Sequence, residues 1–451
     1  MLHFVSSGLL RPKKHDNHVN RLNRYLNYGL LRLATDAATG GHAASVHHGG
    51  YADPSQTVDA LGVLTDADEV LLSLPSFYSV PWAQHFLAIL QDRSPKTIVI
   101  CGGRWVTNGN TRWVRDKLDV ADVVEGLGEQ YILNRYTAHG PRVSRPLNYS
   151  LMTDFLEYQP SIEVSRGCGR GCIFCAEARV PQTRGVRPHQ VIDTMVNLSV
   201  QYARGLANAH PPYEVRPYLQ ASNFSPGVRW SAEMAKLYEV HGLEMTWRAE
   251  ARVDAMRPET IAHLARAGLR VLDLGLESAS PSQLLAMGKA TNPARYLEKA
   301  TETLEACNAH GVSTKLNIVL FAGETLDTVE ETRTWLLERK ALIAGVSANP
   351  VTVYLAPQAD VLLSQLGALG ARPVDARSLH ETGIAKMHLS STIDYDKAVE
   401  LCLSISRDLM TAPSFFELKR YGYYSPSVQW EDFARAAIRD DPGTLPFRWA
   451  A

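Results

Sequence analysis

The chain has 451 residues, of which 45% are hydrophobic and 21% are charged, and its formal net charge is −1. This balance is typical of a globular protein with about two or three domains, and it excludes a strongly basic surface for nucleic acid. No apolar run approaches the roughly 20 residues that a membrane span needs. The N-terminus has no charged start and no cleavage-like site, so we expect no signal peptide.

Strands alternate with helices over the first third of the chain. We expect strands at 3–7, 42–46, 70–74, 97–101 and 123–124, and helices at 22–31, 82–93 and 111–118. This alternation predicts a parallel, doubly wound sheet with a ligand crevice at the carboxyl ends of its strands. Residues 1–150 are therefore expected to form a Rossmann-like domain.

A second alternating pattern predicts a partial barrel over residues 151–345. The expected strands are 161–165, 214–220, 245–250, 271–275 and 314–321, with a last strand at 349–355, and the expected helices are 187–203, 230–240, 258–267 and 291–309. Six such units predict a partial (β/α)6 barrel whose active site lies at the carboxyl ends of the strands.

The remainder, residues 346–451, is expected to hold the last barrel strand and a mixed, mainly helical extension. Its aromatic stretch at 415–424 suits a cap over the substrate, but spacing of three and four residues favours a helix packed on the barrel.

Three cysteines follow the first barrel strand in one tight run, Cys168, Cys172 and Cys175, with the spacing C-x3-C-x2-C. Thiolates favour iron–sulfur clusters or zinc. Structural zinc sites usually have four ligands in two pairs, and no second pair follows here. Three ligands suit a [4Fe–4S] cube instead, because one iron then stays open.

The remaining cysteines are scattered singly through the sequence, at Cys101, Cys307 and Cys402. Because free cysteine behaves as a small hydrophobe, we expect these three in the core. A second cluster is therefore not expected.

The cysteine run resembles the motif of the radical S-adenosylmethionine (SAM) superfamily. The resemblance implies that the open iron of a [4Fe–4S] cluster binds SAM and that an electron from the cluster cleaves it to methionine and a 5′-deoxyadenosyl radical. It also implies a flavodoxin- or ferredoxin-type electron donor. Such an oxygen-sensitive cluster favours a reducing, cytoplasmic location.

Other positions match the SAM-binding elements of that superfamily. The resemblance implies SAM contacts from Phe174, Ser222, Asn223, Arg252, Glu277, Ser278 and Gly323. Phe174 and the turn at Gly323 would flank the adenine, and Glu277, in a G-x-E-S element, would accept hydrogen bonds from the ribose or the amine. Arg252 would bind the SAM carboxylate, although a pair with Asp254 or Glu250 is an alternative.

The first domain resembles the cobalamin-binding domain of one large branch of the superfamily, in its position and in Gly102, Gly103 and the segment that ends in Gly128. A plain turn would also explain the glycine pair. The branch's D-x-H-x-x-G element is imperfect here, because Arg21 stands in place of the glycine after His18. The resemblance therefore leaves two alternatives, cobalamin bound without a histidine ligand and a domain that lost the cofactor.

Taken together, these features predict a radical SAM enzyme that methylates an unactivated carbon of a small-molecule or peptide natural product with cobalamin. Ring contraction, cyclisation, rearrangement or sulfur insertion without methyl transfer is the main alternative. A non-catalytic iron–sulfur or zinc module is a remote one. No nucleic acid or membrane partner is expected, and no catalytic residue beyond the cluster ligands is identified.

Overall fold

The computed structural model describes residues 1–107, 109–137, 146–178, 182–183, 185–206 and 214–449. Contacts within the chain divide it into two compact units. The first unit contains Met1–Glu157, Tyr354–Asp360 and Arg377–Ile384, and the second contains Tyr158–Val353, Val361–Ala376 and Ala385–Ala451. The three predicted domain ranges stay predictions.

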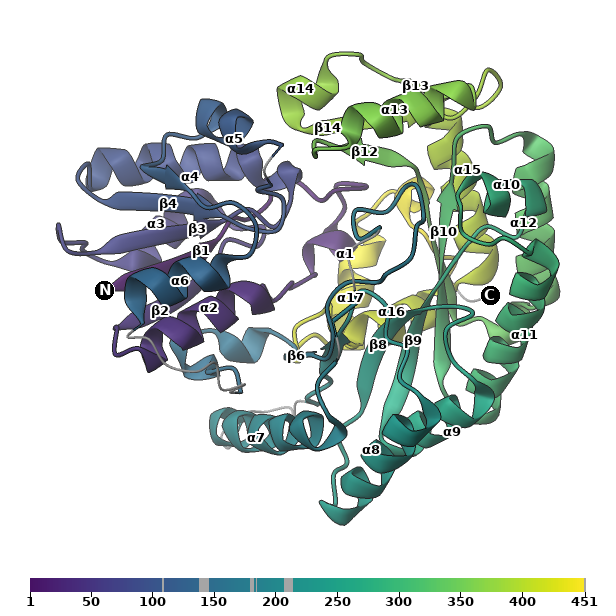
Figure 1. Cartoon of the computed structure of the whole chain (residues 1–451), viewed down its shortest axis with the longest axis horizontal. Coiled ribbons are helices and arrows are strands. Elements are labelled where there is room, and N and C mark those ends of the chain that lie inside the picture. Colours follow the sequence, from purple (N-terminus) through teal and green to yellow (C-terminus); the bar gives the residue numbers. More distant parts are fainter. Residues whose placement is uncertain (108, 138–145, 179–181, 184, 207–213, 450–451) are drawn as a thin grey trace. The chain divides into compact units, whose positions relative to one another are not determined.

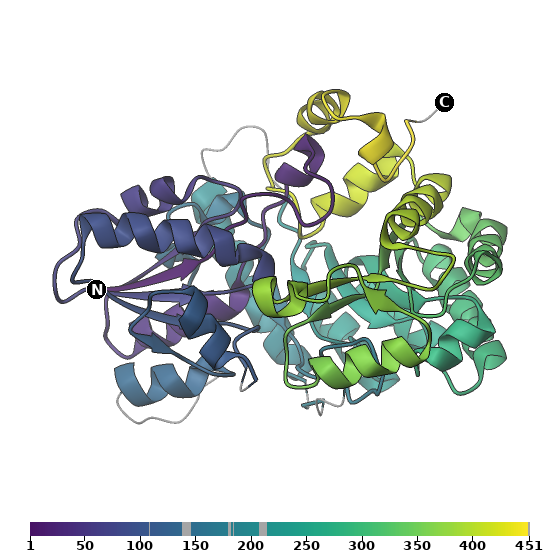
Figure 2. The same cartoon turned by 90° about the horizontal axis from the view of Figure 1, so that it is seen from above.

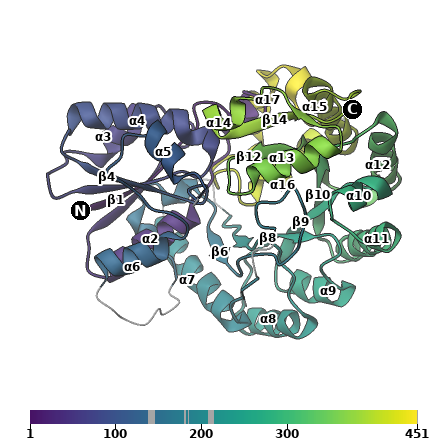
Figure 3. The ribbon, with the colours of Figure 1, turned by 45° about the horizontal axis from the view of Figure 1, so that its top comes forward.

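The first unit is built on a parallel sheet with the strand order β2-β1-β3-β4-β5. Its strands are β1 (Leu2–Ser6), β2 (Ala44–His48), β3 (Glu69–Ser73), β4 (Ile98–Gly102) and β5 (Asp122–Val123). The helices are α1 (His18–Arg21), α2 (Tyr28–Thr39), α3 (Pro54–Leu61), α4 (Val80–Arg93), α5 (Thr111–Lys117) and α6 (Gly128–Tyr136). Figure 3 shows α3 and α4 on one face of the sheet and α2 and α6 on the other, which confirms the doubly wound fold.

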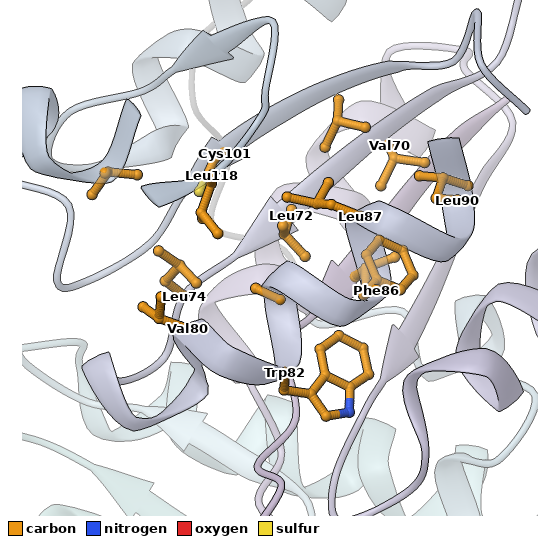
Figure 4. Packing of buried hydrophobic residues seen from close by; sticks show 14 of the residues in the cluster. Val70, Leu72, Leu74, Val80, Trp82, Phe86, Leu87, Leu90, Cys101 and Leu118 are labelled. Carbon is orange, nitrogen blue, oxygen red and sulfur yellow. The ribbon is translucent and has the colours of Figure 1, made fainter. Parts of the chain in front are cut away.

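The core of this unit lies between the sheet and α4. Trp82 and Phe86 are fully buried on α4, and their rings stack with centroids 5.3 Å apart. They pack over the apolar side chains of β3, which Figure 4 shows together with Cys101 on β4. The continuous apolar run of β3 is thus explained, because both faces of this strand are covered.

The helix that we expected over 22–31 is wrong in its first half. Residues 22–27 separate α1 from α2, and an asparagine begins each helix. The Asn27 side chain accepts a hydrogen bond from the Leu30 backbone N–H at 3.1 Å, so the new helix begins here.

The second unit contains a parallel sheet with the order β11-β10-β9-β8-β7-β6. Figure 1 shows its strands β8, β9 and β10 side by side with α8, α9, α11 and α12 arrayed outside them. The strands are β6 (Ser161–Glu163), β7 (Tyr218–Gln220), β8 (Trp247–Arg252), β9 (Leu269–Glu277), β10 (Ser313–Leu320) and β11 (Gly345–Pro350). The connecting helices are α7 (Pro188–Leu206), α8 (Val228–Val240), α9 (Pro258–Arg266), α10 (Pro281–Ala286), α11 (Pro293–Ala309) and α12 (Leu326–Glu338).

Among the described residues this sheet has the strand count and the sequential order of a partial (β/α)6 barrel, which confirms the predicted fold class. The last strand is corrected: it is Gly345–Pro350 rather than 349–355. Pro350 has no N–H to donate, and the chain leaves this sheet there. The helix that packs on β11 is α15 (Tyr395–Leu409), more than forty residues further on.

A small three-stranded sheet, unforeseen from the sequence, fills the interval between β11 and α15. It has the order β12-β14-β13, formed by β12 (Thr352–Tyr354), β13 (Arg372–Pro373) and β14 (Ile384–His388), with α13 (Ala359–Ala368) and α14 (Ser378–Thr382) between the strands. These segments are the green ribbon of Figure 2. The chain ends with α16 (Ala412–Arg420) and α17 (Trp430–Ile438).

The aromatic stretch at 415–424 packs rather than standing free. Phe415, Phe416 and Tyr424 are buried, as helical packing requires. The segment also reaches the amino end of the barrel, where the fully buried Arg248 donates to the carbonyls of Leu418 at 2.6 Å and Tyr421 at 3.1 Å. Within the described ranges, none of the helices combines the length and apolar character needed to span a bilayer.

Candidate active site

The cysteine loop follows β6 at the carboxyl edge of the barrel sheet. Two glycines in left-handed conformations, Gly167 at φ +72° and Gly169 at φ +66°, flank Cys168 and let the loop turn sharply. A turn then joins the other two cysteines, since the N–H of Cys175 donates to the carbonyl of Cys172 at 3.2 Å. Cys172 is buried, and Cys168 and Cys175 are half-buried.

The three thiols influence one another. Burial raises the pKa of the Cys175 thiol, and negative charge on Cys172 and Cys168 raises it further. In the described part of the chain, however, no three His, Cys, Asp or Glu side chains are arranged to hold a single metal ion. An iron–sulfur cube takes each thiolate on a different iron. Three soft donors on one loop therefore fit a [4Fe–4S] cluster.

Arg252, at the end of β8, connects this loop to the rest of the edge. Its Nη1 lies 3.5 Å from the Cys172 Sγ, and its Nη2 donates to the Lys289 carbonyl at 2.8 Å. The same guanidinium pairs with Asp254 at 2.9 and 3.2 Å, and its contact with SAM stays a prediction. The Asn223 side chain accepts the Arg252 backbone N–H at 2.9 Å and so belongs to the same group.

Glu277 ends β9 in a left-handed conformation at φ +69°, which is rare for a residue with a side chain. Its buried carboxylate pairs with Lys289 Nζ at 3.0 Å. A Cβ atom on Gly275 would lie 2.6 Å from the Glu277 Oε1, so any larger residue there would have to displace this carboxylate. The glycine and glutamate of the G-x-E-S element are thereby explained.

The other predicted SAM contacts are distributed along the same edge. Phe174 and Phe321 meet edge to face, with ring centroids 6.2 Å apart. Gly323 adopts φ +78°, and its N–H donates to the Leu389 carbonyl at 2.8 Å. Next to it, burial raises the pKa of Glu324 to about 7.

The two predicted serines have protein partners. Ser222 is exposed and donates to Glu177 at 3.0 Å. Ser278 is buried, and its hydroxyl lies 3.0 Å from the hydroxyl of Thr332 on α12. In this structure Ser278 therefore joins β9 to a helix.

Two side chains of the site were not predicted. Lys289 is the partner of Glu277, and Tyr296 on α11 donates to the carbonyls of Gly275 at 3.0 Å and Leu276 at 3.1 Å. The ring of Tyr296 also lies under the Arg252 guanidinium, 5.7 Å from it. Neither position carries a sequence signal, because a single lysine in a polar turn and a single tyrosine in a helix are ordinary.

The glycines predicted to face cobalamin lie in the first unit. A Cβ on Gly103, at φ +123°, would lie 2.7 Å from the Leu74 carbonyl oxygen, and a Cβ on Gly128 would lie 2.8 Å from Leu33. Packing inside the unit thus accounts for both, while Gly102 has only ordinary contacts at 3.5 Å or more.

The switch point of this sheet, between the carboxyl ends of β1 and β3, is polar. The Asn27 amide donates to the hydroxyls of Ser6 and Ser73, each at 3.1 Å. Such hydroxyl and amide groups fit a ligand rich in amides and phosphate, as cobalamin is. Asp16, in the imperfect D-x-H-x-x-G element, pairs with Arg21 at 2.7 Å.

Comparison with known proteins agrees with the barrel. Residues 162–336 match the model of the radical SAM superfamily. The chain is 25% identical over 172 residues to an uncharacterized methyltransferase of Pyrococcus horikoshii, a match that covers 38% of this chain and 35% of the relative. It is 23% identical over 305 residues to the anaerobic magnesium-protoporphyrin IX monomethyl ester cyclase of Rubrivivax gelatinosus, covering 57% of this chain and 51% of the relative.

Solved structures share the fold of both units. One is the radical S-adenosylmethionine methyltransferase TsrM from Kitasatospora setae with cobalamin and a [4Fe–4S] cluster bound; it has a TM-score of 0.61 and 15% identity, and the match covers 100% of this chain and 93% of TsrM. Another is the cobalamin-dependent S-adenosylmethionine radical enzyme OxsB, with a TM-score of 0.59 and 13% identity over 97% of this chain and 65% of OxsB. With the cysteine loop, the barrel and the matched family model in agreement, residues 162–336 form a domain of the radical SAM superfamily.

Proposed function

We propose that this radical SAM enzyme transfers a methyl group to an unactivated carbon of a small-molecule or peptide substrate with the help of cobalamin. The observation that carries the radical chemistry is the convergence at one sheet edge of the cysteine loop, Arg252 and the Glu277–Lys289 pair. A plain metal-binding module would need the thiols but not the buried carboxylate and its strained backbone.

Different groups of residues would hold the iron–sulfur cluster and SAM. When bound, a [4Fe–4S] cluster supplies the electron that cleaves SAM to the 5′-deoxyadenosyl radical. Cys168, Cys172 and Cys175 would each ligate one iron, and Arg252 would place a positive charge beside Cys172.

We propose that the nucleoside part of SAM lies along the remaining edge. Glu277 would accept hydrogen bonds from ribose hydroxyls or the amine, held in place by Lys289. Phe174, Phe321 and the backbone turn at Gly323 would offer flat and apolar surfaces to adenine. The Arg252 guanidinium would contribute positive charge near the SAM carboxylate rather than a free fork, because Asp254 occupies that fork.

Cobalamin and methyl transfer rest on two observations. The polar switch point of the first unit and the fold shared with TsrM and OxsB favour cobalamin. The matched curated relatives are considerably longer than the matched segments, so their activities remain proposals for this chain. A small redox protein of the flavodoxin or ferredoxin type would supply the electron in the cytoplasm.

The similarity to a cyclase favours a second candidate, radical cyclisation or rearrangement without methyl transfer. The mass of the product separates the two candidates. Methylation adds one methyl unit to the substrate, and cyclisation does not.

The test is anaerobic reconstitution with iron and sulfide, followed by metal analysis and SAM cleavage under a strong reductant. We expect about four irons per chain, no zinc, and release of 5′-deoxyadenosine. The variant C168A/C172A/C175A should lose both iron and cleavage. The control C402A, in a buried cysteine away from the loop, should keep both. Zinc in the wild type, or iron retained by the triple variant, would contradict the proposal.

A further inference from the structure

The inner face of the barrel sheet carries a layer of charged side chains below the SAM edge. Glu250 on β8, Asp273 on β9 and Lys315 on β10 stand opposite one another in register. The alternate residues of β8, Ala249 and Ala251, are buried on the other face, so Glu250 points into the barrel.

The two carboxylates of this layer have unequal surroundings. Asp273 is almost completely buried and accepts from Arg248 Nε at 2.6 Å, while Lys315 Nζ lies 3.4 Å away. Lys315 also donates to Asn317 at 3.1 Å, so both of its contacts lie on β10 and β9. Asp273 is therefore neutralised within the protein.

Glu250 has no such partner. Among the described residues, the Glu250 carboxylate accepts one hydrogen bond, from the Tyr218 hydroxyl at 3.3 Å, and no cation lies within 4.0 Å of it. Carboxylates of the protein interior are ordinarily paired, because an unpaired buried charge is costly.

Glu250 is open to solvent and is nevertheless surrounded by protein. The side chain is exposed to solvent, yet burial raises its pKa, and the charges of Asp273 and Glu277 raise it further against the opposing effects of Lys315 and Arg248. A group on the outer surface would not feel such burial. Both facts agree if the carboxylate lines an internal space that is open to small molecules, as the inward direction of Glu250 requires.

We infer that Glu250 is the anchor for a protonated amine of the substrate inside the barrel. The inference rests on the proposed function, because it takes the barrel interior as the place of the substrate. An ammonium group would supply the missing counter-charge and would hydrogen-bond directly to the carboxylate. An anionic substrate group would meet the Glu250 carboxylate and would be repelled. Glu250 is thus a positioning residue that selects substrates by charge.

Three fragments of one size test this charge preference: benzylammonium, benzyl alcohol and benzoate. Their binding to the reconstituted wild type is measured by ligand-observed NMR and compared with E250Q. The matched control is E239Q, a surface glutamate that pairs with Arg266. We expect the wild type and E239Q to bind benzylammonium most tightly and benzoate least. In E250Q the affinity for benzylammonium should fall by roughly tenfold or more, with little change for benzyl alcohol.

Several results would overturn the inference. One is equal binding of benzylammonium by E250Q and the wild type, and another is a wild type that prefers benzoate or binds no fragment saturably. If E250Q does not fold, the order of the three fragment affinities for the wild type still tests the inference. SAM cleavage by the same wild-type preparation tests the proposed function separately. If SAM is not cleaved but the preference for the amine is intact, only the proposed function is contradicted.

Discussion

Glu324, in the turn after β10, is a single residue that makes the stability of the second unit depend on pH. Its side chain is almost completely buried, and burial raises its pKa from 4.5 to about 7, although Thr328 and the Phe321 N–H donate to it. Between these two pH values the folded protein retains a proton that the unfolded chain has lost. Stability therefore falls as pH rises from about 4.5 to about 7, by at most about 3 kcal/mol.

The variant E324Q should remove this decline, because an amide stays neutral at every pH in the range. Scanning calorimetry of both proteins from pH 5 to pH 8 measures it. We expect the melting temperature of the second unit to fall with pH in the wild type more steeply than in E324Q. Parallel curves would show that Glu324 is charged in the folded protein.

At this scale the sequence predicted some site residues and not others. Cys168, Cys172 and Cys175 stand in one short run, and Glu277 stands two residues after Gly275 in a G-x-E-S element, so local sequence was sufficient to identify them. Lys289 is different. It meets Glu277 only because the chain returns after α10 to the end of β9, and that return is a tertiary feature without a local pattern.

Among the elements, the end of β4 offers a test of backbone geometry. Gly103 has a left-handed φ of +123° and would place a Cβ 2.7 Å from the Leu74 carbonyl oxygen at the end of β3. Its neighbour Gly102 would place a Cβ no closer than 3.5 Å to any atom. We expect G103A to destabilise the first unit by about 1–3 kcal/mol and G102A to change it little.

Thermal unfolding of both variants, followed by tryptophan fluorescence of the first unit, checks the expectation. If cobalamin also binds there, the stable G102A variant is the one in which its affinity can be compared with that of the wild type. Equal melting temperatures for G103A and G102A would mean that the turn after β4 relaxes without cost.

Strand order and strand type followed from the sequence because the barrel strands alternate with helices along the chain. The small sheet did not follow, since β13 has two residues and its partner β14 lies more than ten residues away. The last barrel strand was misplaced for a related reason. The apolar residues at 351–355 belong mainly to β12, and only the register of Lys315 opposite Gly345 shows that β11 begins earlier.

At the scale of the whole molecule, each unit has a hydrophobic core of its own. The core around Trp82 and Phe86 draws all its members from the first unit. We therefore expect C168A/C172A/C175A to lose its iron and still take up hydroxocobalamin with the affinity of the wild type. Absorbance of the corrin after gel filtration measures this, with C307A as the control. Loss of the corrin together with the iron would mean that the first unit depends on the cluster.

The hydrogen bonds from Arg248 to the carbonyl of Leu418 in α16 and to that of Tyr421 just after it have one more consequence. These hydrogen bonds hold the α16 segment against the amino end of the barrel near β8. A substrate would therefore enter from the carboxyl end of these strands. Glu250 lies one inward-facing position before Arg252 on β8. A molecule bound to Glu250 would therefore lie nearer the amino end of the barrel than the cysteine loop does. A substrate bound to Glu250 would therefore have to bind before SAM and could dissociate only after SAM or its products have left.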